Sequence, residues 1–168
     1  MEEASALITI AEISLGLAGF AGIVAAVGLR AGHWHAADTL RVLVLLISAV
    51  GVLFLALVSA GLYFADLSST TVAATSSATM LAYTAAGIAY LMPRMREYRS
   101  LSDFEFVSWA YRTTVAVGSV LNAAAQLFNI VGVAWGSTFA VFYGGLVWML
   151  FVGVLQFIRI ILIRPPSK

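Results

Sequence analysis

"LRVLVLLISAVGVLFLALVSAGLYFA", residues 40–65, decides the fold of this chain, because its only charged residue is Arg41 near the start. A helix needs about 20 apolar residues to cross the hydrocarbon layer of a bilayer, and this stretch is longer than that. Four more stretches meet the same criterion, at about Ser5–Leu29, Thr70–Met92, Phe106–Trp135 and Thr138–Ile163. The sequence therefore predicts an all-α bundle of five transmembrane helices, forming one integral membrane domain over residues 1–168.

The composition agrees with a membrane environment and excludes several classes of function. The chain is 62% hydrophobic and 10% charged, whereas a soluble domain is roughly 25% charged. Its net charge of +1 gives a nucleic-acid partner no electrostatic basis. The absence of cysteine excludes disulfides and thiol nucleophiles. Glu2 and Glu3 stand where a signal peptide needs basic residues, so we expect the first apolar stretch to be kept as a span.

The basic residues predict the orientation of the five spans. They cluster around the first and third connections and in the C-terminal tail: Arg30, Arg41, Arg94, Arg96, Arg99, Arg112, Arg159, Arg164 and Lys168. Positively charged loops stay in the cytoplasm, which places the N-terminus outside and the C-terminus in the cytoplasm. The third span is rich in Ser, Thr and Ala, but without it the basic segments could not share one side. Pro93 is expected to end this helix.

One face of the fourth predicted helix is polar over most of its length. Its polar residues are Ser108, Arg112, Ser119, Asn122, Gln126 and Asn129. Two interpretations stay open. The side chains could bind neighbouring helices, each bond contributing about 0.6–2 kcal/mol. They could instead line a water path, which the length of the stripe, about 31 Å, favours slightly. The hydroxyl-rich start of the third span is interpreted as close packing in preference to a vestibule.

The first span combines an acid with small residues. Glu12 lies roughly 10 Å below the outer end of its helix, at a depth similar to that of Gln126. A carboxylate in this position costs at least about 2.5 kcal/mol unless it is protonated or hydrated. Gly16, Gly19 and Gly22 predict close helix packing beside it. The sequence does not show whether this face meets the fourth helix.

Other candidates have ordinary explanations. His33 and His35 are weak candidates for metal ligands, and a solvated loop is the preferred interpretation. Asp38 is expected to cap the second helix, and Arg112 to supply a charge at the cytoplasmic end of the fourth. The sequence contains no phosphate-binding glycine loop, His-Glu zinc motif or nucleophile with a base. We therefore predict neither enzymatic activity nor a cofactor.

"AEISLGLAGFAGIVAAV" (Ala11–Val27), followed by Trp34, Asp38 and Arg41, resembles the opening of small polytopic bacterial inner-membrane proteins of uncharacterised activity. The resemblance covers about the first quarter of the chain. It implies a bacterial cytoplasmic (inner) membrane location and a polytopic fold, and it implies no activity.

Two hypotheses of function follow from the polar residues. The first is a homo-oligomeric channel or pore-like protein for ion transport, in which Glu12 forms an acidic ring that favours cations. Ser119, Asn122, Gln126 and Asn129 would then face the permeating ion or its water. The second is a non-conducting structural or accessory subunit, whose polar residues on the first and fourth predicted helices dock a helix of a membrane-protein partner. The lipid bilayer is the expected surrounding in both.

Overall fold

A computed structural model of the chain describes residues 2–30, 36–65, 67–99, 109–132 and 138–162. This part of the chain is entirely helical apart from short turns, and its helices are α1 (Glu2–Arg30), α2 (Ala36–Phe64), α3 (Ser69–Arg99), α4 (Trp109–Val131) and α5 (Phe139–Leu162). Each of the five is long and apolar enough to cross a membrane. The prediction of five helices that are long and apolar enough to span a membrane is confirmed.

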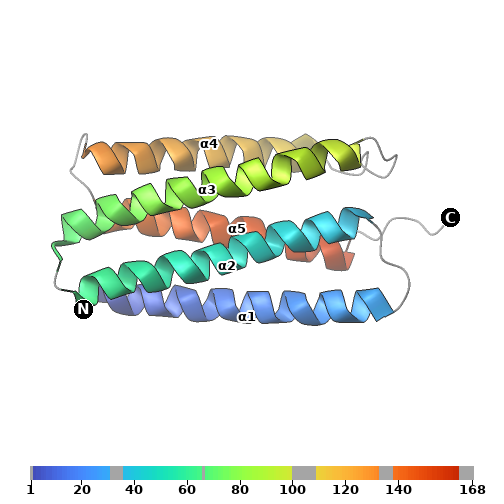
Figure 1. Cartoon of the computed structure of the whole chain (residues 1–168), viewed down its shortest axis with the longest axis horizontal. Helices are drawn as coiled ribbons and strands as arrows, with labels where there is room; N and C mark the ends of the chain where they lie inside the picture. Colours follow the sequence, from blue (N-terminus) through green and yellow to red (C-terminus); the bar gives the residue numbers. More distant parts are fainter. Residues whose placement is uncertain (1, 31–35, 66, 100–108, 133–137, 163–168) are drawn as a thin grey trace.

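The helices run alternately up and down along one common axis (Figure 1). α2 is central, because it packs against α1, α3 and α5, and α4 packs against α3 and α5. α1 and α4 lie at opposite edges of the bundle in Figure 1. The two polar faces predicted from the sequence therefore belong to helices that do not adjoin.

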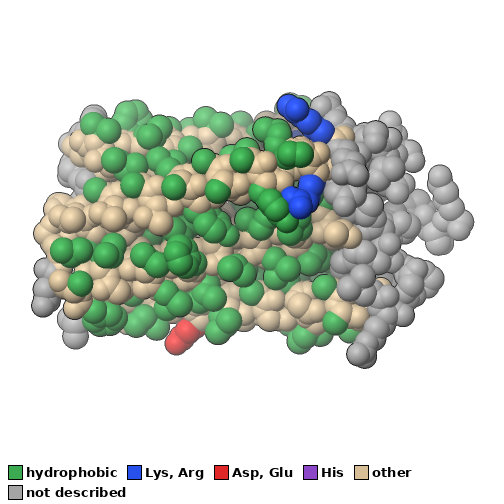
Figure 2. All heavy atoms as spheres, in the orientation of Figure 1, with side chains coloured by type: hydrophobic (Ala, Val, Ile, Leu, Met, Phe, Trp, Pro, Cys, Tyr) green, Lys and Arg blue, Asp and Glu red, His purple; other side chains and the backbone are tan. Residues whose placement is uncertain are grey.

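The core is formed by large apolar side chains from α1, α2, α3 and α5, among them Leu7, Leu55, Met80, Phe142 and Leu146. Lipid tails are as apolar as these residues, so helix association in a membrane depends on close packing and hydrogen bonds. Apolar side chains also cover the outside of the bundle, where green predominates among the side chains in Figure 2. This distribution fits a bundle that is surrounded by lipid.

A glycine on α5 lies in close contact with side chains of α4. A Cβ at Gly145 would lie 2.5 Å from Gln126 Nε2 and 2.9 Å from Asn122 Oδ1. Gly144 points away from the core, and a Cβ there would meet nothing within 4 Å. The absence of a side chain at position 145 therefore makes room for the two α4 amides.

The prediction that Pro93 ends the third helix is wrong, because α3 continues through it to Arg99. Proline removes a backbone donor and leaves the Ala89 carbonyl without its helical partner. Ala89 is exposed and lies in the last turns of the span, where water or headgroups can satisfy the carbonyl. Arg94 Nη1 also donates to the Tyr90 carbonyl at 3.0 Å, which supports the helix beyond the proline.

The start of α2 also differs from the expectation. α2 begins at Ala36, so Asp38 lies within its first turn instead of preceding the helix. The Asp38 carboxylate accepts a hydrogen bond from Arg41 Nη1 at 2.9 Å. An acid in the first turn is favourable near the helix N-terminus, which explains why the position suits Asp38.

Basic side chains gather at one end of the bundle. The connectivity brings the start of α2 and α4 and the end of α3 and α5 to this end, which carries Arg41, Arg94, Arg96, Arg112 and Arg159. Basic side chains are visible there in Figure 2. The opposite end, where α1 begins, carries Glu2 and Glu3. The bundle is thus electrically asymmetric along its axis.

Gly145→Ala tests the close approach of α5 to α4. The added Cβ would lie 2.5 Å from Gln126 Nε2 and 2.6 Å from Met80 Sδ, so packed side chains have to move. We expect the free energy of unfolding to fall by about 1–3 kcal/mol, the usual cost of overpacking a core. Unfolding by SDS in mild detergent, followed by circular dichroism, measures the change.

Gly144→Ala is the matched control for this experiment. Because the site is open, the substitution brings only the helix preference of Ala over Gly, which is up to about 1 kcal/mol. We expect the control to be as stable as the wild type or slightly more stable. Equal stability of the two variants would contradict the packing described for position 145.

Candidate functional site

Gln126 is the most deeply buried polar residue of α4, with an exposed fraction of 0%. Its Oε1 accepts a hydrogen bond from Ser77 Oγ of α3 at 2.7 Å. Its Nε2 donates to Asn122 Oδ1 at 3.1 Å and to the Val141 carbonyl of α5 at 3.0 Å. The amide therefore uses both donors and one acceptor inside the protein.

Asn129 connects α4 to the beginning of α5. Its Nδ2 donates to Ser77 Oγ at 2.8 Å and to the Thr138 carbonyl at 3.1 Å. Its Oδ1 accepts the Thr138 backbone N–H at 2.7 Å. Gly132 follows α4 with a φ of 69°, the left-handed conformation that ends many helices. Asn129 thus holds the residue before α5 in place once α4 has ended.

Ser77 joins the two amides into one network. Its hydroxyl donates to Gln126 and accepts from Asn129, so one side chain of α3 holds two of α4. Together, Ser77, Asn122, Gln126, Asn129, Val141 and Thr138 form the polar seam between α3, α4 and α5. For Gln126 and Asn129 the geometry favours the interhelical interpretation over a water path, since both amides are already bonded within the chain.

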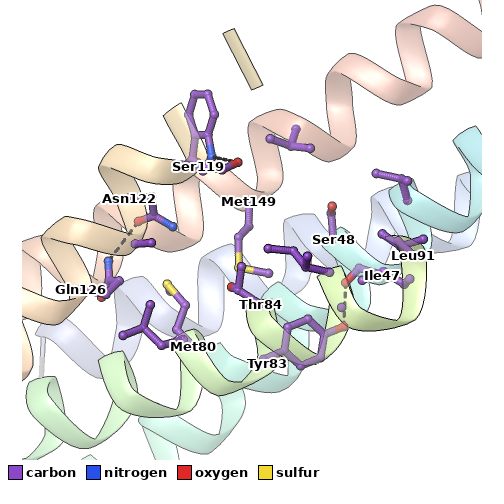
Figure 3. Close-up of a pocket in the computed structure, with 17 residues that line it drawn as sticks. Ile47, Ser48, Met80, Tyr83, Thr84, Leu91, Ser119, Asn122, Gln126 and Met149 are labelled. Atoms are coloured by element: carbon purple, nitrogen blue, oxygen red, sulfur yellow. Dashed lines mark hydrogen bonds between the residues drawn. The ribbon is translucent and has the colours of Figure 1, made fainter. Parts of the chain in front are cut away.

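Ser119 and Asn122 continue the stripe but are only half-buried. Ser119 Oγ accepts a weak hydrogen bond from Trp148 Nε1 at 3.4 Å. Asn122 Oδ1 is occupied by Gln126. Both residues border a cavity of about 170 Å³ between α2, α3, α4 and α5 (Figure 3). Ser119 and Asn122 therefore border open space, whereas the side chains of Gln126 and Asn129 are bonded within the protein.

Glu12 lies on the outward face of α1 and is exposed. An acidic side chain interrupts the apolar surface over α1 in Figure 2. Glu12 makes no hydrogen bond or ion pair with any residue that the structure describes. Since α1 and α4 lie at opposite edges, the structure does not bring Glu12 to Asn122, Gln126 or Asn129.

The three glycines predicted to pack closely lie on the same outward side of α1. A Cβ added at Gly16, Gly19 or Gly22 would meet nothing within 4 Å. Among the residues that the structure describes, these glycines therefore make no close helix contact. Glycines in close contact with neighbouring helices lie elsewhere in the bundle. A Cβ at Gly118 of α4, for example, would fall within the ring of Trp148.

Arg112 is exposed in the first turns of α4, at the basic end of the bundle. His33 and His35 lie outside the described residues. Sequence reasoning missed a cluster between α4 and α5, in which Gln156 Nε2 donates to the Tyr111 hydroxyl. Arg159 stacks over the Tyr111 ring at 4.2 Å from its centroid. The pairing joins residues far apart in sequence, so no local signal marks it.

The close packing expected for the hydroxyl-rich start of α3 is found at Ser76 and Ser77, whereas Thr70, Thr71 and Thr75 are exposed. Ser76 and Ser77 are buried, with exposed fractions of 2% and 0%. Ser59 Oγ of α2 donates to Ser76 Oγ at 2.7 Å. Adjacent serines thus hold α3 to two different helices, Ser76 to α2 and Ser77 to α4.

No protein-family model, curated protein or solved structure matches this chain. The functional interpretation consequently depends on the geometry of its own residues.

Ser77→Ala tests whether the seam holds the helices together. The substitution removes one donor to Gln126 and one acceptor of Asn129. Interhelical hydrogen bonds in membranes average about 0.6 kcal/mol each, so we expect the free energy of unfolding to fall by about 1–2 kcal/mol. Reversible SDS unfolding in mixed micelles measures this change in the free energy of unfolding.

Thr79→Ala serves as the control, because its exposed hydroxyl bonds only to the Thr75 carbonyl of its own helix. A surface substitution of this kind changes stability by about 0.5 kcal/mol or less. If Ser77→Ala were as mild as the control, the seam would not stabilise the bundle.

Proposed function

We propose that this chain is a subunit of a homo-oligomeric, pore-like membrane assembly, in which copies meet through α1 and their Glu12 carboxylates form a cation-selective ring. One observation carries the proposal: Glu12 is exposed on an apolar helix face, beside glycines with open space around them. The α4 seam takes no part in conduction here, because its buried amides are bonded inside the subunit.

The position of Glu12 makes association favourable. α1 begins at Glu2, so Glu12 lies about 15 Å along the helix axis. Its span covers 27 residues, Glu2–Gly28, which puts the carboxyl group near the middle of the bilayer. A lone carboxylate facing lipid there costs at least about 2.5 kcal/mol. Contact with other subunits, or with water enclosed between them, removes this cost.

Copies of the same chain are suitable partners for this face. Gly16 and Gly19 leave room for a second backbone to approach, as small residues do at membrane helix interfaces. Cyclic symmetry repeats one surface around an axis and holds every Glu12 at one depth. Rings of acidic side chains are a common selectivity device of cation channels. A ring thus gives the carboxylates both hydration and a counter-ion.

The charge asymmetry of the bundle supports an orientation. Basic side chains gather at the end that carries Arg41, Arg94 and Arg159. By the positive-inside rule this end faces the cytoplasm. We accordingly place the N-terminus outside and the C-terminus in the cytoplasm. The sequence resemblance supports a bacterial inner membrane.

A non-conducting accessory subunit is the second candidate. It is favoured by the saturation of Gln126 and Asn129, which leaves no continuous water path through one subunit along the seam. In this case α1 would dock a helix of a different membrane protein, one that carries a basic residue level with Glu12. Such a complex would be electrically silent.

Glu12→Gln tests the conducting function. In liposomes we expect the purified protein to pass monovalent cations, and we expect the substitution to reduce this flux at least about tenfold, since each 1.4 kcal/mol of lost electrostatic stabilisation is a factor of ten. Glu2→Gln is the control, because Glu2 is an exposed acid at the end of α1. Normal flux in Glu12→Gln would exclude a role for the carboxylate. Absence of flux in the wild type would favour the accessory function.

A single cysteine at Gly19 tests association through α1. The chain has no cysteine of its own, so Gly19→Cys introduces the only thiol. Mild oxidation in native membranes should yield a covalent dimer, read on a non-reducing gel.

Val120→Cys on α4 is the control for this experiment. Val120 is 69% exposed on the far edge of the bundle, and we expect little dimer from it. Equal cross-linking at both positions would mean random collision, and α1 would lose its role as the interface.

A further inference from the structure

The cavity between α2, α3, α4 and α5 has walls of a particular chemistry (Figure 3). Its volume is about 170 Å³, and none of the described residues that line it is acidic or basic. The wall includes two thioethers, Met80 and Met149, and the indole of Trp148. Thioethers adapt to irregular shapes and contact aromatic rings favourably. An uncharged occupant with a flat ring would suit these walls.

Several hydrogen-bond donors in this cavity have no partner among the residues that the structure describes. The Ser48 side chain of α2 is one, although only 9% of the residue is exposed. Asn122 accepts at Oδ1 from Gln126, while its Nδ2 turns away from Gln126 toward the cavity in Figure 3. Thr84 of α3 adds a third donor at the same cavity. Three different helices thus direct unpaired donors into one apolar space.

An acceptor atom on a ligand would give these donors a partner. A buried polar group without a partner is unfavourable, and a carbonyl oxygen can accept from Asn122 Nδ2 and from a hydroxyl at once. We propose that the cavity binds a neutral, lipid-soluble molecule whose head carries a carbonyl oxygen. This inference does not depend on the function proposed for Glu12, because the cavity and the outward face of α1 share no residue.

The size and position of the cavity narrow the class of ligand. A cavity of about 150 Å³ in an apolar core is known to hold one benzene ring, so the space fits a single ring. Ile88 borders the cavity and is 51% exposed on the outside of the bundle. A ligand tail can leave on that side into the bilayer. A ring carbonyl, as in a tailed quinone, and an ester carbonyl of a glycerolipid share this chemistry.

Binding to the full-length protein in mild detergent tests the proposal. The probes are a decyl-substituted benzoquinone, a decylbenzene without carbonyl oxygen, and a short-chain diacylglycerol, and calorimetry measures each Kd. We expect a carbonyl-bearing probe to bind at least tenfold more tightly than decylbenzene. Tighter binding of the benzoquinone identifies a ring ligand, and tighter binding of the diacylglycerol identifies an ester. Equal binding of decylbenzene, or no binding of any probe, would overturn the proposal.

Two variants connect the binding to this cavity. Thr84→Val keeps the shape of the side chain and removes a donor, and combined with Ser48→Ala it should raise Kd at least fivefold. Ala123→Phe fills the cavity, which Ala123 lines, and should abolish binding. Val120→Phe on the outward face of α4 is its control, with unchanged Kd. Glu12→Gln should also bind normally, so failure of the channel hypothesis is distinguishable from failure of this one. Unchanged Kd in both cavity variants would place the probe elsewhere and refute the assignment.

Discussion

Within the hydrocarbon layer a polar side chain needs a partner in the protein, because the solvent offers none. This constraint is met most fully at Ser77, whose hydroxyl donates to Gln126 and accepts from Asn129. Asn129 in turn holds both backbone polar groups of Thr138 just before α5. The mutual alignment of α3, α4 and α5 follows from this chain of bonds. A shift of one residue in any of the three helices would leave a buried amide unpaired.

Much of the fold could be predicted from the sequence, and the partners of the polar residues could not. Span length and hydropathy identify each helix by itself, and the spacing of Asn122, Gln126 and Asn129 shows that they share a face. What that face contacts depends on another helix, and helical periodicity holds no information about the neighbour. Ser77 belongs to a run of hydroxyl residues in which nothing in the local sequence separates it from Ser76, yet the two bond to different helices. The prediction for Pro93 is wrong for a related reason, since the surroundings of the freed carbonyl decide whether a helix tolerates proline.

Glycine illustrates the same limit in a second way. The spacing of Gly16, Gly19 and Gly22 predicts a surface suited to close packing, but spacing does not reveal whether the packing partner is in the same chain. The structure leaves these three open and places Gly145 and Gly118 under large side chains. In the sequence, Gly144 is as plausible a site of close packing as Gly145, and only the orientation of α5 distinguishes the two. An internal packing role and an external one are therefore indistinguishable without the arrangement of the helices.

The separation of α1 from α4 has a consequence for how the molecule can work. Glu12 and Gln126 are polar residues well inside their spans on opposite edges of one bundle, and α2 and α5 lie between them. Gln126 is bonded within the chain, whereas Glu12 has no hydrogen-bond or ion-pair partner among the residues that the structure describes. The polar residues thus divide into an internal set, which fixes the bundle and borders the cavity, and the external Glu12, which would favour association in the proposed assembly. Because α2 contributes Ser48 to the cavity and also packs against α1, it is the element through which an occupied cavity could affect association. Any coupling between cavity occupancy and association would have to appear as a movement of α2 relative to α1. Such coupling would therefore be detected at the α1–α2 contact.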